Sequence, residues 1–151
     1  MADTPAAISD EALLARFVNT RNQPAGSRTL GLTMTRVSQA ERLVEAEFDA
    51  RAEILANPMK QVQGGYLCAM LDEVMSVACM VASGMTCVAP TLEMKTSFFR
   101  PAMPGRLQAV GRVVRWGKTI AFTEGEIFDG EGRLAAKATG TAMPTPFSNY
   151  K

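Results

Sequence analysis

Residues 62–84 read Val-Gln-Gly-Gly-Tyr-Leu-Cys-Ala-Met-Leu-Asp-Glu-Val-Met-Ser-Val-Ala-Cys-Met-Val-Ala-Ser-Gly. This stretch predicts one long, almost wholly buried helix that begins at a pair of glycines. No charged side chain occurs from Val74 to Pro90, so protein rather than water is expected on most sides of the helix. Asp72 and Glu73 are the exceptions, because a carboxylate in an apolar helix is costly to bury unless it has a partner or a function. They are the first candidate functional residues.

Length, charge and cysteine content limit the class of protein. The chain has 151 residues and a net charge of +1, which fits a single domain with scattered basic residues. We therefore expect no nucleic-acid partner and no basic membrane-binding patch. The three cysteines favour reduced, packed thiols, and the N-terminus does not resemble a signal peptide. The apolar stretch is shorter than the ~20 residues of a membrane span, so we expect a cytoplasmic protein with no membrane partner.

Histidine is absent from the chain. This excludes Ser-His-Asp and Cys-His mechanisms and metal sites that depend on histidine. Acid–base chemistry would then fall to carboxylate, lysine, tyrosine or cysteine side chains.

The rest of the pattern predicts an α+β fold with one domain. We expect a short helix over 11–20, a loop over 22–27, a hairpin of strands 29–37 and 42–50, an irregular segment over 51–62, and antiparallel strands near 92–99, 107–116, 119–129 and 133–143. The predicted sheet of about six strands curls around the long central helix. The expected division is an N-terminal extension 1–28, of which 1–8 is expected to be disordered, a main domain 29–143 and a tail 144–151. Because such a sheet has open edges, we expect a homo-oligomer.

The glycine pair lies where the long helix begins. A helix start carries unpaired N–H groups and the positive end of the helix dipole, so the Gly64 or Gly65 amide could hold a developing oxyanion. The alternative is that the glycines only permit a tight turn into the helix. Asp72 follows them by seven or eight residues, which is roughly 10 to 12 Å along the axis. If Asp72 and a glycine amide act on one carbonyl, the amide must belong to a second copy of the chain.

The sequence resembles the hotdog-fold acyl-CoA thioesterases, and within them the phenylacetyl-CoA thioesterase-like branch. The resemblance covers about residues 40–143 and is carried by Gln63-Gly-Gly-Tyr-Leu-Cys-Ala-Met-Leu-Asp72, by Pro90-Thr-Leu-Glu-Met-Lys-Thr-Ser-Phe-Phe-Arg-Pro101, by Gly105 and by Gly117-Lys-Thr-Ile-Ala-Phe-Thr123. It implies a helix wrapped by an antiparallel sheet, two chains that share a continuous sheet, and dimers or dimers of dimers.

The resemblance also implies roles for individual residues. Asp72 would activate water or attack the thioester carbonyl, and the Gly64 amide of the opposing subunit would bind the oxyanion. Asn57 and Thr91 would position the water. The family usually has His-Gly-Gly where this chain has Gln63, and glutamine can donate a hydrogen bond but does not titrate near neutral pH.

The substrate implied by the resemblance is an acyl-CoA, hydrolysed to a free acid and coenzyme A without metal or redox cofactor. The expected substrate-binding residues are Gln63, Gly65, Gly117, Lys118, Thr119 and Arg100, with Arg115 as a further phosphate contact and Tyr66, Met70, Met75 and Phe98 as possible linings of the acyl pocket. The alternatives are a solvated surface charge for each basic residue and ordinary core filling for the apolar ones. A catalytically weak acyl-CoA-binding module of the same fold is the alternative. A hydratase is disfavoured, because hotdog hydratases have a histidine in the site.

Overall fold

The computed structural model describes residues 8–18 and 23–149. Its helices are α1 Asp10–Val18, α2 Ala25–Leu30, α3 Ala52–Leu55 and α4 Gly64–Ala82, followed near the C-terminus by a 3-10 turn, Phe147–Asn149. Its strands are β1 Leu32–Ser38, β2 Leu43–Ala50, β3 Cys87–Val88, β4 Thr91–Phe98, β5 Gly105–Trp116, β6 Ala121–Phe128, β7 Leu134–Ala142 and β8 Thr145–Pro146.

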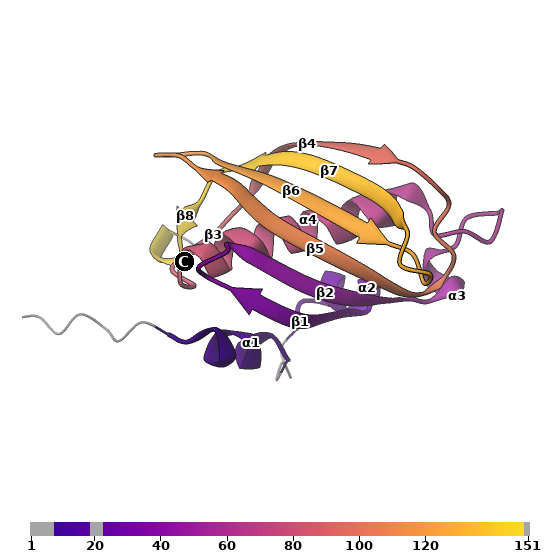
Figure 1. Ribbon diagram of the computed structural model, residues 1–151, viewed down its shortest axis with the longest axis horizontal. Helices are drawn as coiled ribbons and strands as arrows, with labels where there is room; N and C mark the ends of the chain where they lie inside the picture. Colours follow the sequence, from indigo (N-terminus) through magenta and orange to yellow (C-terminus); the bar gives the residue numbers. More distant parts are fainter. Residues whose placement is uncertain (1–7, 19–22, 150–151) are drawn as a thin grey trace, which may run out of the picture.

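Six strands form one antiparallel sheet in the order β1-β2-β5-β6-β7-β4. The sheet curves over α4, which lies along its concave face (Figure 1). This arrangement confirms the predicted fold class, the hotdog fold with a long central helix and a sheet of six strands. The approach is close enough to require a glycine on β5: a Cβ at Gly111 would lie 2.2 Å from the carbonyl oxygen of Val74.

The central helix is buried over its second half and more open over its first. Its buried residues are Leu67, Met70, Leu71, Val74, Met75, Val77, Ala78, Cys79 and Val81. Gly65 and Ala69 are exposed, so the prediction of an almost wholly buried helix is wrong for the N-terminal half. The helix is long and apolar enough to cross a membrane, but the sheet wraps it as a core helix.

Three short elements lie where the sequence predicted loop, strand or tail. Helix α2 replaces the end of the predicted loop and the start of the first predicted strand; it begins directly after Pro24 and ends at Gly31, whose φ is 71°. Helix α3 lies in the segment predicted to be irregular. Strand β8 lies in the predicted tail and pairs with β3. The residues predicted to be disordered fall almost entirely outside the described residues, as does the end of the first predicted helix.

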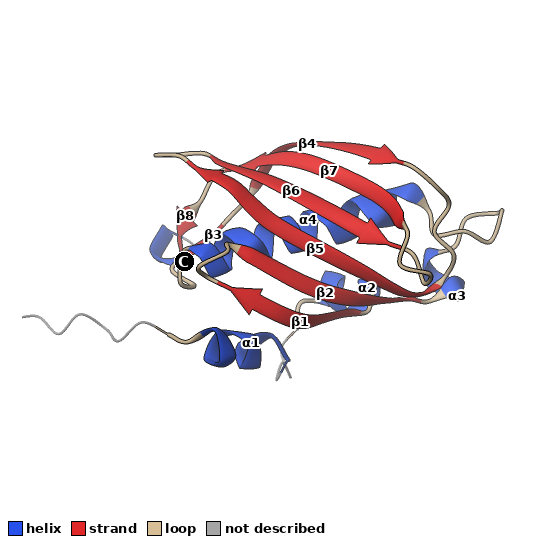
Figure 2. Cartoon of the chain, viewed as in Figure 1, coloured by secondary structure: helices blue, strands red, loops and turns tan. Residues whose placement is uncertain are grey.

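The two edges of the sheet differ. Helix α1 packs against the edge strand β1, whereas within the described chain no element pairs with the outer edge of β4, as Figure 2 shows. Two large apolar side chains of β4, Leu92 and Phe98, remain 54% and 53% exposed. An uncovered strand edge with apolar side chains is a site for association with another chain.

Candidate functional site

The first turn of α4 is held by Gln63. The residue has φ −66° and ψ 136°, and its side-chain Oε1 accepts a hydrogen bond from the Tyr66 amide at 3.3 Å. Gln63 therefore caps the helix. Its Oε1 atom is occupied by this hydrogen bond, although the side chain was predicted to bind substrate. A Cβ at Gly65 would lie 2.8 Å from this Oε1 atom, so a larger residue at position 65 would displace the end of the Gln63 side chain.

The Gly64 and Gly65 amides lie in the first turn of α4, where N–H groups have no partner within the helix. Both stand at the positive end of the helix dipole. The ring of Phe98 covers the Cα of Gly64: a Cβ there would lie 3.3 Å from the Cζ atom of Phe98. The start of the helix is thus a pair of donors beside an aromatic ring.

Asp72 and Glu73 point to different sides of α4. The Thr91 hydroxyl donates to Oδ1 of Asp72 at 2.5 Å, whereas the Ser27 hydroxyl donates to Oε1 of Glu73 at 2.8 Å. Asp72 is half-buried and belongs to no ion pair among the described residues. The structure therefore joins the predicted pair Asp72 and Thr91 and separates both from Glu73.

One face of α4 follows strand β4. Gly64, Cys68 and Asp72 are four residues apart and lie above one another on the helix, and they meet Phe98, Thr96 and Thr91 of the strand. The middle contact joins the Cys68 sulfur to the Thr96 hydroxyl at 3.5 Å. Sequence reasoning missed Cys68 as a site residue, although its position midway between Gly64 and Asp72 was a usable signal.

A cavity of about 400 Å³ opens beside Gly64. Its lining contains Asn57, Gly64 and Arg100 together with Gln61, Val62, Leu67, Phe98, Phe99, Pro101 and Ala102. Oδ1 of Asn57 accepts hydrogen bonds from the amides of Met59 at 2.9 Å and Gln61 at 3.0 Å. The loop thus fixes the Asn57 side chain through its oxygen, and the NH₂ group is the part suited to a ligand.

The remaining predicted residues lie at the other end of the sheet. Thr91 pairs with Ala142, which pairs with Ala121, so the 117–120 turn between β5 and β6 lies at the Thr91 end. The Gly117 amide donates to the Ile120 carbonyl at 2.9 Å within this turn, and the Lys118 and Thr119 residues are exposed.

A single protomer therefore holds the predicted site residues in two separate groups. We call Asn57, Gly64 and Arg100 the amide half-site, and Asp72 and Thr91, with the 117–119 turn beyond them, the acid half-site. Along β4 the two ends are about 23 Å apart, and Gly64 and Asp72 are about 12 Å apart along α4.

Most of the predicted acyl-pocket residues belong to the core instead. Met70 and Met75 are 0% and 2% exposed, and Tyr66 packs against the core cluster. Of the four predicted residues, Phe98 alone lines the cavity of the amide half-site. Met70 and Met75 therefore fill the core, which is the alternative that the sequence left open for them.

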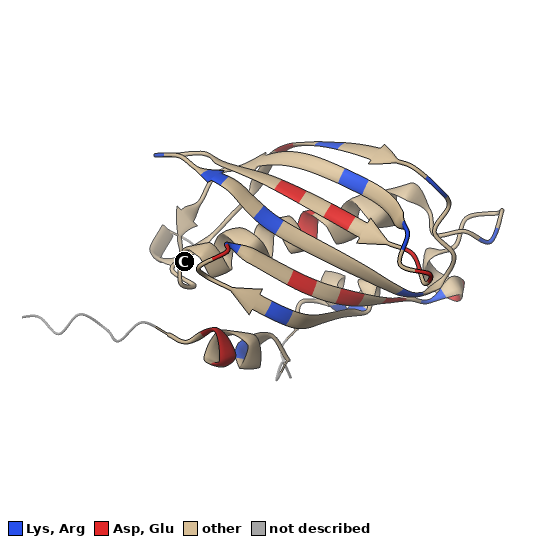
Figure 3. Ribbon diagram, in the orientation of Figure 1, with Lys and Arg blue, Asp and Glu red and all other residues tan. Residues whose placement is uncertain are grey.

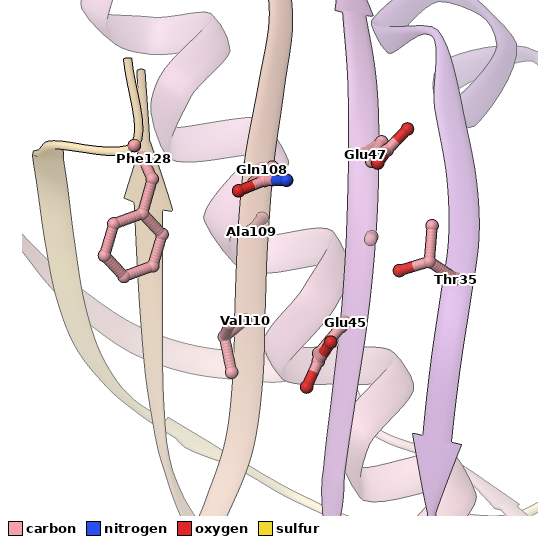
Figure 4. A pocket seen from close by; sticks show the side chains of 9 residues that line it. Thr35, Glu45, Glu47, Gln108, Ala109, Val110 and Phe128 are labelled. Carbon is pink, nitrogen blue, oxygen red and sulfur yellow. The ribbon is translucent and has the colours of Figure 1, made fainter. Parts of the chain in front are cut away.

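A second depression lies on the convex face of the sheet, away from α4, and contains none of the predicted residues. Figure 4 shows Glu45, Glu47, Gln108, Val110 and Phe128 projecting from β2, β5 and β6 around it. Its carboxylates are already paired: Glu45 with Arg36 at 3.0 Å and Glu47 with Arg106. These ion pairs favour a solvated face over a catalytic site.

Neither a metal site nor a basic patch is evident in the part of the chain that the structure describes. No group of three or more Cys, Asp or Glu side chains there is placed to hold a metal ion, and charged residues are spread over the strands (Figure 3). Burial, with the neighbouring Cys87, raises the pKa of Cys79 to about 12, so this thiol stays protonated and inert.

Comparisons with known proteins agree with the fold. The thioesterase superfamily model matches residues 59–136. A phenylacetic acid degradation-related protein of Ralstonia eutropha JMP134 is 34% identical, with 86% of this chain and 98% of that chain covered and a TM-score of 0.76. The protein PA5202 of Pseudomonas aeruginosa is 28% identical, with coverages of 82% and 95% and a TM-score of 0.74.

A curated relative from Thermoplasma volcanium, whose name describes an esterase, is 34% identical over 79 residues, which is 52% of this chain and 59% of that protein. The chain thus spans little more than half the length of this relative. The superfamily match covers more than half of the chain, and the Ralstonia protein matches over almost its whole length. The chain belongs to the thioesterase superfamily.

Proposed function

We propose that this chain hydrolyses an acyl-CoA thioester to a free acid and coenzyme A, in a site formed between two copies of the chain. The observation that carries the proposal is the half-buried Asp72 carboxylate, which accepts from the Thr91 hydroxyl and has no cationic partner among the described residues. A carboxylate in such a position is suited to take a proton from water.

The proposed dimer pairs the open edges of two β4 strands in antiparallel orientation. Leu92 and Phe98 lie three residues to either side of Lys95 on β4. A two-fold axis at Lys95 therefore sets Leu92 of each copy opposite Phe98 of the other and covers part of both exposed side chains. On α4, Gly64 and Asp72 lie four residues to either side of Cys68.

The midpoint on β4, Lys95, and the midpoint on α4, Cys68, lie beside each other. Cys68 contacts Thr96, which is the neighbour of Lys95. One axis would therefore relate both the strands and the helices, and would bring the amide half-site of one copy to the acid half-site of the other. Gly65 and Ala69 are exposed in the N-terminal half of α4. These small residues leave room for α4 of the second copy to approach.

In the proposed reaction the thioester carbonyl oxygen accepts a hydrogen bond from the Gly64 amide of one copy. Asp72 of the other copy takes a proton from water. The water oxygen then bonds to the acyl carbon, the C–S bond breaks, and the proton passes to the sulfur of coenzyme A. The Asn57 NH₂ group and the Thr91 hydroxyl position the water. Direct attack by Asp72, with an anhydride intermediate, uses the same groups.

The coenzyme A arm is proposed to leave the site past the turn at residues 117–119. This turn lies at the Thr91 end of the sheet and presents the Lys118 ammonium to solvent. Arg115 lies on the strand before the turn. These cations suit the phosphates of coenzyme A.

Substitution of Asp72 by Asn tests the proposal, with Glu73→Gln as its matched control. Both changes remove one carboxylate charge from α4, but on different sides of the helix. Asp72→Asn is expected to lower single-turnover hydrolysis of a panel of acyl-CoA esters by about 10²- to 10⁴-fold and to leave coenzyme A binding intact. Glu73→Gln is expected to retain activity. Equal activities of the two variants would contradict the proposal.

A catalytically weak acyl-CoA-binding module is the second candidate, favoured by Gln63, whose side chain caps the helix rather than facing a ligand. The same panel separates the two functions. Stoichiometric binding of acyl-CoA without turnover, in both the wild type and Asp72→Asn, would favour the module.

A further inference from the structure

The Phe98 ring lies against Gly64, whose amide is the proposed oxyanion donor. Its ring carbons lie 3.3 to 3.9 Å from the position that a Cβ on Gly64 would take. It is 53% exposed and lines the cavity of the amide half-site. One side of the ring therefore covers the helix start, and the rest faces the open cavity.

The path of the coenzyme A arm indicates that the acyl group of the substrate lies in this cavity. The acyl group and the sulfur extend from opposite sides of the thioester carbonyl. Since the proposed coenzyme A arm runs from the acid half-site past the 117–119 turn, the acyl group lies on the other side, in the cavity beside Gly64. This step rests on the proposed function.

We propose that Phe98 sets the upper size of the acyl group that can reach the Gly64 amide. The ring occupies part of the cavity at the point where the acyl chain begins. Its cross-strand neighbour is Ala136, a small residue that is 0% exposed and cannot move in to refill the space. Shortening Phe98 thus enlarges the cavity next to the reacting carbon.

Phe99 does not have the same role, although it lines the same cavity. The atoms nearest to a Cβ at Gly64 all belong to Phe98 and none to Phe99, which follows the end of β4. The Phe99 amide donates a hydrogen bond to the Ala135 carbonyl at 2.8 Å. This bond holds the end of β4 to β7. The backbone on the C-terminal side of Phe98 is therefore fixed to β7.

The experiment compares the wild type with Phe98→Leu and Phe98→Ala on acetyl-, butanoyl- and octanoyl-CoA. The ratio of kcat/KM for octanoyl to that for acetyl is expected to rise about 10-fold or more in Phe98→Ala, the order that a few methylene groups provide in an apolar pocket. Phe98→Leu should lie between. Phe122→Ala is the matched control, because Phe122 is an aromatic residue of β6 that is 44% exposed, and the ratio should not change.

The outcomes keep this inference separate from the proposed function. An equal fall for all three esters, or an unchanged ratio in a dimeric Phe98→Leu, would overturn the role of Phe98 while hydrolysis itself stands. If the wild type hydrolyses none of the esters, the proposed function fails. The same ratio is then measured as the affinities of the thioether analogues of the three esters, and an unchanged ratio overturns the inference. Sedimentation establishes that each variant remains a dimer.

Discussion

The Gly64 amide can be removed without a large change to the helix. Proline is favoured at the first position of a helix, and the residue before it must be extended, as Gln63 already is. Gly64→Pro is expected to retain helix content by circular dichroism and to lower single-turnover hydrolysis by about 10²- to 10³-fold, the usual effect of losing one oxyanion donor.

Gly64→Ala is the control for this change. It adds the same Cβ against the Phe98 ring but keeps the N–H group. If the two variants lose activity equally, contact with Phe98 rather than the lost donor explains the effect, and the Gly64 amide is not the oxyanion donor.

Asp129 predicts how stability depends on pH. The Arg133 amide, which donates to its Oδ1 at 2.9 Å, is the main cause that lowers the pKa of Asp129 below its usual value. The carboxylate therefore stabilises the fold above the pKa of the unfolded chain, near 4, and this contribution is lost as pH falls through the lower native pKa. Asp129→Asn is expected to lower the urea midpoint at pH 7, with a smaller difference at pH 3.

Glu131→Gln is the control for the pH experiment. Glu131 belongs to the same loop and pairs with Arg133, but its side chain is mostly exposed, so its removal should have little effect at either pH. A difference in urea midpoint between the wild type and Asp129→Asn that stays constant from pH 7 to pH 3 would show that the Asp129 charge does not stabilise the fold.

The sequence predicts some site residues for physical reasons and others not at all. A carboxylate within an apolar helix is conspicuous, and the structure places Asp72 half-buried against Thr91. That contact joins residues 19 positions apart, so local pattern could not reveal it, and it entered only through the family resemblance. The cap formed by Gln63 was also missed, because glutamine is not among the residues commonly preferred at that position.

Strand β4 is the element on which the proposed dimer depends. Leu92→Arg would place a charge, without a partner, against Phe98 of the second copy, and burying such a charge is costly. We expect the dimer dissociation constant to rise by about 100-fold or more, and hydrolysis to fall in parallel. Sedimentation and activity over a range of protein concentrations measure both.

Val114→Arg provides the control for this interface. Val114 is 58% exposed on β5, a strand that lies between β2 and β6 and is not at the open edge. A Leu92→Arg protein that remains dimeric, or a monomer with full activity, would contradict the proposed arrangement.

Long elements were predictable and short ones were not. The helix of 19 residues and the alternating strands carry enough periodicity to be identified. Strands β3 and β8 have two residues each, too few for any period, and they exist because the chain returns to pair with itself. Helix α2 was missed because Pro24 and Gly26 indicate a loop, although proline is equally suited to the start of a helix.

The molecule as a whole holds the proposed site residues in two groups, which lie at opposite ends of β4 and at the start and the middle of α4. The curved sheet fixes both half-sites against α4, but at a separation that no substrate carbonyl can bridge within one protomer. Two copies related by an axis near Cys68 and Lys95 would complete two equivalent sites. Activity would then depend on residues from different chains.

The most direct test mixes two inactive proteins, Asp72→Asn and Gly64→Pro, after unfolding and refolding them together. If each site takes Asp72 from one copy and Gly64 from the other, every mixed dimer has one site with both lesions and one with neither. About a quarter of the wild-type activity should then return at a 1:1 ratio, since half of the dimers are mixed. No recovered activity, with mixed dimers shown to form by differential tagging, would contradict a site shared between two chains.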